Sequence, residues 1–387
     1  RPASAGWPSA TRTTARAARA STLRSSRVLT WSSTETGAFP FDTEFTHASV
    51  FDPATSTFIN VDNNFHDMFC AGVSTLENGT IVAAGGNPSD RRTSAFNPAT
   101  NLWSPLANMV DLRWYGILAT LPNNTIFASF AKDAGNRTEV YDPRTNTWAT
   151  RANVVVQDQL NEQNAINAAP NPTGSLVLEW LSHLAVTPQG DLIQAGPTPT
   201  WHRYDPVGGA PSTALGQPIG DVVRSFGNAV TYGPGKVMLI GGADPRANPP
   251  VSVNRVYRVD LNGPSPTVTP GPAMTYPRAL SNTVTLPNGE LLTIGGNTVA
   301  LQFNDPGSVL PAEIYNPTSN AWRVVDSIDV PRNYHSTALL LKDGRVLSAG
   351  GGGGGNGCAA NHLDGQIYSP PYLFEANDTP AVRPTLS

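Results

Sequence analysis

The chain has 387 residues, only 14% of them charged, and a formal net charge of −4. This balance excludes the strongly basic surface that nucleic-acid-binding domains need. No apolar run approaches the length of a membrane span, and a chain of this length can bury an ample core without a disulfide framework. The 35 Gly and 35 Pro indicate strands and turns rather than long helices.

Residues 1–26 differ in composition from the rest of the chain. They hold five Arg and many Ala, Ser and Thr, and no acidic residue occurs before Glu35. This composition resembles a transit peptide, but the chain begins at Arg1 without Met, and a mis-assigned stretch of gene explains it equally well. We expect an irregular segment here and assign it no function.

A repeated unit occupies residues 27–387. Its marker is an apolar strand that follows a Gly-, Pro- or Asn-rich turn and ends in small residues. These strands begin at Arg27, Thr80, Thr125, Asp191, Lys236, Glu290 and Arg345. Spacings of about 45 to 66 residues match the kelch type of repeat, with four strands per blade. The sequence therefore predicts an all-β fold, a seven-bladed kelch-type β-propeller with essentially no helix.

A second marker comes later in most units, as an aromatic residue two positions before a proline. It occurs at Phe51, Phe96, Tyr141, Tyr204, Tyr315 and Tyr368, and Trp103, Trp148 and Trp322 follow three of these turns. We expect these aromatic side chains to pack the blades rather than to form a site.

Three chemically distinctive residues share one position in the repeat. Cys70, Tyr115 and His335 each lie ten residues before the start of an apolar strand, and Tyr334 precedes His335. Equal offsets in a repeating fold predict equivalent positions in space. A thiol, two phenols and an imidazole should then meet at one mouth of the central channel, where propellers usually carry their function.

Other readings of these residues stay open. Cys70 by itself is a common type of buried apolar residue, and a Cys70–Cys358 disulfide is an alternative. Tyr334 and His335 could form a structural pair. His362 fits a hydrogen bond within its loop better than a metal site.

Set in kelch-type units, these segments resemble the galactose oxidase and glyoxal oxidase family of copper radical oxidases. The resemblance covers roughly residues 27–387 and is strongest at 66–72, 332–355 and 361–373. It implies a thioether between Cys70 and the ring of Tyr115, which would be an equatorial copper ligand. It also implies an axial phenol from Tyr334 and an imidazole ligand from His335.

The implied chemistry explains these residue types. Copper(II) favours nitrogen and oxygen donors, and phenols, with a pKa near ~10, need a metal to ionise at neutral pH. A thioether makes the ring of Tyr115 easier to oxidise, so copper and this radical cofactor hold one electron each. Tyr334 would take the substrate's proton. The implied reaction converts a primary alcohol or aldehyde, carbohydrates included, with O2 into an aldehyde or acid and H2O2.

The sequence departs from the family in three respects. The family's second histidine ligand lies in a C-terminal β-sandwich domain that is absent from this chain, and His183 is only a weak substitute. No Trp follows Phe127, and the sugar-binding Arg has no match. The 387-residue chain alone is therefore expected to be inactive. A non-catalytic propeller, serving as a structural or adhesive glycoprotein of a wall, sheath or filament, is the alternative.

Four N-x-Thr sequons favour a secreted, extracellular glycoprotein. They lie at Asn78, Asn123, Asn136 and Asn377. Asn78 and Asn123 fall on predicted hairpin tips, where a glycan could be accommodated.

Overall fold

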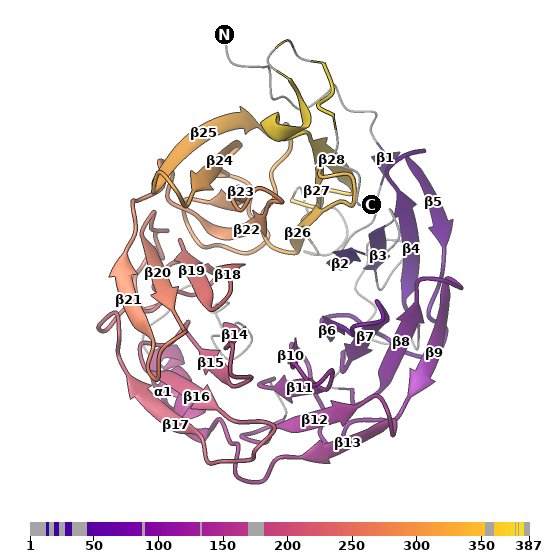
Figure 1. Ribbon diagram of the computed structural model, residues 1–387, viewed down its shortest axis with the longest axis vertical. Coiled ribbons are helices and arrows are strands. Elements are labelled where there is room, and N and C mark those ends of the chain that lie inside the picture. The colour runs from indigo at the N-terminus through magenta and orange to yellow at the C-terminus, as the bar shows by residue number, and fades with distance from the viewer. Residues whose placement is uncertain are drawn as a thin grey trace.

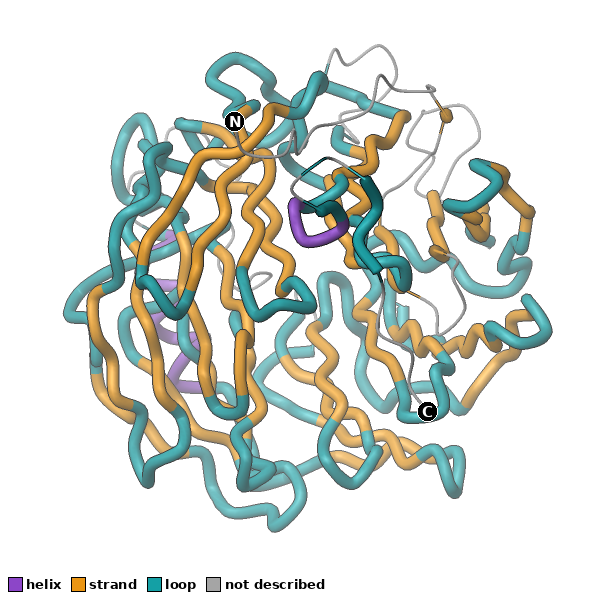
Figure 2. The backbone as a smooth tube through the Cα atoms, turned by 45° about the horizontal axis from the view of Figure 1, so that its top comes forward, coloured by secondary structure: helices purple, strands orange, loops and turns teal. Residues whose placement is uncertain are grey.

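The computed structural model describes residues 13–14, 19–22, 28–32, 45–86, 90–131, 134–168, 182–352, 360–375, 377 and 379–382. Over these residues the fold is all-β, with four-stranded antiparallel sheets arranged as blades around a central axis (Figure 1). The first strands of neighbouring sheets contact one another, so they line the axis. The loops and turns lie at the ends of the strands (Figure 2).

Six sheets are each built from four consecutive strands. The first three comprise β2 (Arg19–Thr22), β3 (Val28–Ser32), β4 (His47–Asp52) and β5 (Thr57–Asn60); β6 (Gly72–Thr75), β7 (Ile81–Ala84), β8 (Thr93–Asn97) and β9 (Leu102–Leu106); β10 (Ile117–Thr120), β11 (Ile126–Ser129), β12 (Glu139–Asp142) and β13 (Thr147–Thr150). The next three comprise β14 (Leu184–Val186), β15 (Leu192–Gln194), β16 (Trp201–Tyr204) and β17 (Thr213–Gly216); β18 (Asn228–Gly233), β19 (Lys236–Ile240), β20 (Val256–Asp260) and β21 (Thr267–Pro270); β22 (Ala279–Thr285), β23 (Leu291–Asn297), β24 (Pro311–Asn316) and β25 (Ala321–Ser327).

The prediction of seven such blades within residues 27–387 was wrong. Within the described residues, six blades are runs of consecutive strands, and the first of them already includes β2, before residue 27. The remaining sheet is composite: β26 (Ser336–Leu340), β27 (Val346–Gly350) and β28 (Asp364–Tyr368) are completed by β1 (Thr13–Thr14), which pairs with β28. Two short strands thus lie in the segment expected to be irregular. Pairing the two ends of the chain closes the ring and covers a sheet edge.

The described part of the chain contains one α-helix, α1 (Gln157–Asn167), and a 3₁₀ turn, Pro371–Leu373. The helix joins β13 to β14 and is mostly polar, with Leu160, Ala165 and Ile166 as its apolar residues, so no apolar periodicity marked it in the sequence. Its Gln159 donates a hydrogen bond to Ser182 and accepts one from Tyr204, which attaches the helix to the sheet of β14–β17. No helix in these described ranges is long and apolar enough to span a membrane.

The predicted strands and their aromatic packing are confirmed. The second strands of the sheets begin within one residue of the predicted positions. The aromatic side chains of the third strands pack on the tryptophans of the fourth, with ring centroids 5.2 Å apart for Phe96–Trp103 and for Tyr141–Trp148. Trp103 also donates a hydrogen bond to the carbonyl of Val61, in the preceding blade.

Buried arginines, which the sequence analysis missed, fix the loops that lead into the innermost strands. Each donates a hydrogen bond to a carbonyl within two residues of the end of the second strand in its own sheet. The pairs are Arg113–Phe130, Arg224–Gly241, Arg278–Gly295 and Arg332–Gly350, at 2.9, 2.6, 2.7 and 2.9 Å. Glu139 lies 3.0 Å from the guanidinium of Arg113, and both side chains are fully buried. These links hold the loops at one mouth of the channel.

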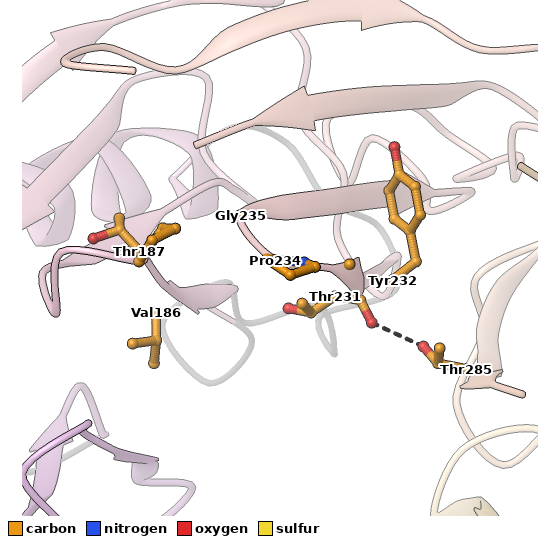
Figure 3. A pocket seen from close by; sticks show the side chains of 9 residues that line it. Val186, Thr187, Thr231, Tyr232, Pro234, Gly235 and Thr285 are labelled. Atoms are coloured by element: carbon orange, nitrogen blue, oxygen red, sulfur yellow. Dashed lines mark hydrogen bonds between the residues drawn. The ribbon is translucent and has the colours of Figure 1, made fainter. Parts of the chain in front are cut away.

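A pocket of about 520 Å³ lies at the opposite mouth (Figure 3). It is lined by the hairpin turns that follow β14 and β18 and by Thr285, the last residue of β22. Thr285 donates a hydrogen bond to the carbonyl of Thr231 across it. The pocket is therefore separate from the predicted site, which lies where the innermost strands begin.

Candidate functional site at one mouth of the channel

The equal sequence offset produces an equal backbone conformation. Cys70, Tyr115 and His335 have φ values of +60°, +62° and +63°, in the left-handed region. Phe226 (+56°) and Leu280 (+62°) share it, and each also lies ten residues before a predicted strand start. Such residues rarely adopt this conformation, which costs on the order of 1–2 kcal/mol each. The same offset could have revealed Phe226 and Leu280, which the sequence analysis missed.

Main-chain hydrogen bonds join equivalent positions of neighbouring blades. The amide of Tyr115 donates to the carbonyl of Cys70 at 3.0 Å, and that of Leu280 donates to Phe226 at 2.9 Å. A Cβ on Gly85 would lie 2.2 Å from the carbonyl oxygen of Arg113, so only glycine allows this approach between the two blades. The Cys70 and Tyr115 segments are therefore held directly against each other.

The structure brings the four predicted side chains together. Cys70 and Tyr115 are buried in one cluster with Phe69. The phenol oxygens of Tyr115 and Tyr334 lie 2.5 Å apart, and the rings of Tyr334 and His335 have centroids 3.8 Å apart. The residues come from loops that precede β6, β10 and β26, in three different sheets.

Burial governs the acid–base behaviour of Tyr115. It raises the pKa of this phenol well above its ordinary value near 10, and the adjacent Cys70 and Tyr334 raise it further. The phenol is therefore protonated at neutral pH unless a positive charge lies beside it. The site favours a phenolate only when it also holds a cation.

His335 is oriented by the loop that follows β27. Its Nδ1–H donates to the carbonyl of Gly352 at 2.7 Å, so Nε2 is the ring nitrogen that could bind a metal. The rings of Phe69 and Phe303 stand edge-on to the imidazole, with centroids 5.9 and 6.2 Å away. The imidazole thus lies between aromatic walls in one tautomer.

Trp114 is an aromatic neighbour that the sequence analysis missed. The position where the family's Trp was sought holds buried Phe130 and Ala131 instead. Trp114 packs on Tyr115 with ring centroids 5.2 Å apart, and it is partly buried against the Cys70 cluster. The position of Trp114 directly before Tyr115 in the sequence could have indicated that it lies beside the site.

His66 braces the Cys70 segment. Its Nε2–H donates to the carbonyl of Gly85 at 2.7 Å, and its Nδ1 lies 2.6 Å from the hydroxyl of Ser94. Burial lowers the pKa of His66 to about 4. The imidazole is therefore neutral in the folded protein at neutral pH.

We expect acid to destabilise the protein through His66. The folded pKa of about 4 lies below the ordinary value of 6.5, so the unfolded chain binds more protons between these values. Stability contributed by neutral His66 is complete above pH 6.5 and is lost as pH falls toward 4, with about 2 kcal/mol lost by pH 5. Urea unfolding at pH 7 and pH 5 should show a smaller pH difference in His66→Gln than in wild type. Equal pH differences would contradict this expectation.

The other predicted residues hydrogen-bond to groups outside this cluster or lie outside the described residues. The Nε2 of His183 hydrogen-bonds to the carbonyl of Gly227 at 3.1 Å, and burial lowers its pKa to about 4. The Nε2 of His362 pairs with a carboxylate on another loop, that of Asp305. Cys358, and with it the alternative Cys70–Cys358 bridge, lies outside the described residues.

Three of the four sequon asparagines are exposed. They are Asn78, Asn123 and Asn377, whereas Asn136 is half-buried. Asn78 and Asn123 lie in hairpin turns, as predicted. No group of three or more His, Cys, Asp or Glu residues in the described ranges could hold a metal. A metal at the channel mouth would depend on the phenols.

Comparisons with known proteins show what this chain is similar to. The glyoxal oxidase N-terminus family matches residues 226–368. Galactose oxidase from Gibberella zeae is 31% identical over 380 residues, which cover 94% of this chain and 54% of that protein. Aldehyde oxidase GLOX1 from Arabidopsis thaliana is 32% identical over 162 residues, covering 36% of this chain and 25% of that protein.

A solved structure shares nearly the whole described fold. It is a fungal alcohol oxidase of the AA5 family in complex with copper, with a TM-score of 0.87, 29% identity, and coverage of 98% of this chain and 79% of that one. Fold and site together define a kelch-type propeller with an axial cluster of phenols, thiol and imidazole. The chain belongs to the galactose oxidase and glyoxal oxidase family. It spans about half the length of the galactose oxidases that it matches.

Proposed function

We propose that the protein is a copper radical oxidase that converts a primary alcohol or an aldehyde, with O2, into an aldehyde or an acid and H2O2. The observation that carries this proposal is the 2.5 Å separation of the Tyr115 and Tyr334 phenol oxygens, with Cys70 and His335 beside them. Relatives named galactose oxidase, aldehyde oxidase and a copper-bound alcohol oxidase support it.

The side chains present fit copper(II). Tyr115 and Tyr334 would supply phenolate oxygens and His335 an imidazole nitrogen, which are donors that copper(II) prefers. When bound, copper would supply the positive charge that lets buried Tyr115 ionise, and it would accept one electron. Three donors from this chain leave room for a further ligand and for substrate.

Cys70 and Tyr115 would supply the second electron store as a thioether-linked pair. In forming it, the Cys70 thiol loses S–H and the Tyr115 ring loses one C–H as a C–S bond forms. The two electrons and two protons reduce O2 to H2O2. The main-chain hydrogen bond between the residues, at 3.0 Å, and their shared burial keep the reacting groups close and away from water.

Tyr334 would act as the base. As a phenolate it would take the hydroxyl proton of an alcohol bound beside it, while two electrons and the carbinol hydrogen leave the substrate. Its ring is flanked edge-on by Phe226 and Phe303, with centroids 6.1 and 5.2 Å away. These apolar walls exclude water and favour a substrate whose reacting carbon carries an apolar group.

Phe303 is expected to contribute to substrate affinity. Its ring is 40% exposed while packing on Tyr334, so a substrate at the channel mouth would contact it. Phe303→Ala should raise the KM for benzyl alcohol about tenfold with little change in kcat, because an apolar contact is lost in the bound state and transition state alike. Phe303→Leu should retain most of the affinity. An unchanged KM in Phe303→Ala would contradict this role.

We also propose a secreted glycoprotein, glycosylated at Asn78, Asn123, Asn136 and Asn377. The exposure of three of these side chains supports the proposal. Peptide mapping of protein from a eukaryotic host, before and after glycan removal, tests each site. Asn136, which is half-buried, should carry the least glycan.

The deciding experiment is peroxide release from protein expressed from its complete gene, loaded with copper and activated with an oxidant. Substrates should include galactose, glycerol, benzyl alcohol, glyoxal and methylglyoxal. Turnover on at least one supports the oxidase. No turnover, together with no stoichiometric copper, would leave the structural or adhesive glycoprotein as the better account.

A further inference from the structure

The hydrogen bond between Asp305 and His362 joins two loops that both contact Tyr334 and His335. Oδ2 of Asp305 and Nε2 of His362 lie 2.9 Å apart, although the residues are 57 positions apart in sequence. Asp305 lies between β23 and β24, and His362 lies between β27 and β28. Because β22 contacts β26, these loops come from neighbouring sheets.

The loop that carries Asp305 covers Tyr334. Phe303, two residues before Asp305, packs edge-on against both the Tyr334 and His335 rings. The side-chain amide of Asn333 donates to the carbonyl of Asn304 at 3.1 Å. The loop thus contacts the site from its aromatic side and also holds the residue before Tyr334.

The loop that carries His362 sets the orientation of His335. The Gly352 carbonyl accepts the hydrogen bond from Nδ1 of His335, and the Gly352 amide donates to the carbonyl of Tyr334 at 2.9 Å. The His362 amide donates to the carbonyl of Gly351 at 3.0 Å. A displacement of His362 would therefore shift the carbonyl that fixes the imidazole.

The carboxylate of Asp305 depends on this partner. Its other oxygen, Oδ1, is buried and has no hydrogen-bond partner among the residues that the structure describes. The side chains of Asp305 and His362 are only 25% and 17% exposed. The pair is thus partly shielded from water, and His362 provides the side-chain contact that holds the carboxylate in place.

We propose that Asp305 and His362 form a positioning pair that keeps Gly352 and Phe303 aligned with His335. The inference rests on the proposed copper site, because an imidazole held in one tautomer and orientation binds a metal more tightly. Groups behind a metal-binding histidine typically change metal affinity by about 10- to 100-fold when they are removed.

The first test is copper(II) titration of the purified protein without substrate. Asp305→Ala and His362→Ala should each raise the Kd about tenfold, and the double variant should add little, since the residues act as one unit. Asp343→Ala is the matched control: it breaks a 2.7 Å pair with Arg345 in the β26–β27 turn, at the other end of the same sheet. The control should change the Kd less than about twofold.

The second readout needs no metal. In ¹⁵N-histidine NMR spectra of the metal-free protein, His335 should give one Nδ1–H tautomer in wild type and the control, and a tautomer mixture in both single variants. Asp305→Asn, close in size, replaces Asp305→Ala if the latter does not fold. Control-like copper affinity and an unchanged His335 spectrum would overturn the proposal. If wild type binds no copper, the proposed function fails, while the spectra still decide on the positioning pair.

Discussion

Tyr115→Phe is expected to abolish peroxide production, with a loss of at least about 10⁴-fold in kcat, because the removed oxygen would be both a metal donor and part of the redox pair in the proposed oxidase. Phenylalanine keeps the buried ring, so the fold should persist. The contact to the Tyr334 oxygen, 2.5 Å in wild type, is lost. Peroxide release at saturating substrate, with matched copper content, measures the effect.

Tyr141→Phe is the matched control for this variant. It removes a phenol oxygen that hydrogen-bonds to Asn146 in blade packing, away from the channel mouth. Activity in this control should stay within about twofold of wild type. Comparable activity in Tyr115→Phe and the control would show that the Tyr115 phenol takes no part in the reaction.

Glu139→Gln is expected to cost about 3–5 kcal/mol of unfolding free energy, since it removes the nearest charge partner of the fully buried Arg113 guanidinium and leaves only the carboxylate of Asp111, 4.0 Å away. Glu139 also accepts hydrogen bonds from the amides of Val110 and Asp111, at 2.6 and 3.1 Å. Because Arg113 lies two residues before Tyr115, the site should loosen as well. The denaturant concentration at the unfolding midpoint and the affinity for copper should both be lower than in wild type.

The control for this prediction is an exposed pair in the same sheet. Asp142→Asn weakens the Asp142–Arg144 contact of 2.7 Å, in which solvent already screens both charges. It should leave the unfolding midpoint almost unchanged. A loss of stability in Glu139→Gln no larger than in this control would show that the buried pair contributes little.

The sequence predicted the strands, and the meeting of the four side chains, because equivalent positions in a repeating sequence take equivalent places in the folded blades. The second strands begin within one residue of expectation. The ten-residue offset predicted that Cys70, Tyr115 and His335 would take equivalent positions, and all three share a left-handed backbone conformation. Phe226 and Leu280 occupy equivalent positions in other blades. Their side chains are purely apolar, so only the thiol, phenol and imidazole at the other positions indicated a site.

What the sequence could not predict depends on pairings between distant segments. Thr13–Thr14 is too short to show a pattern, yet it completes the last sheet through β28. The buried arginines donate hydrogen bonds to main-chain carbonyls. Every residue has such a carbonyl, so the sequence does not show which one accepts the bond. The link between Asp305 and His362 spans two loops whose approach is fixed only once the blades are assembled.

A search for the proposed thioether between Cys70 and Tyr115 tests the proposed chemistry most directly. Protein purified without copper should be loaded with copper in air, then measured by intact mass and by peptide mapping under reducing conditions. We expect a loss of two hydrogens and one joined peptide pair that reductant does not separate, both absent in Cys70→Ala. Separate Cys70 and Tyr115 peptides of unchanged mass, after stoichiometric copper binding, would contradict it.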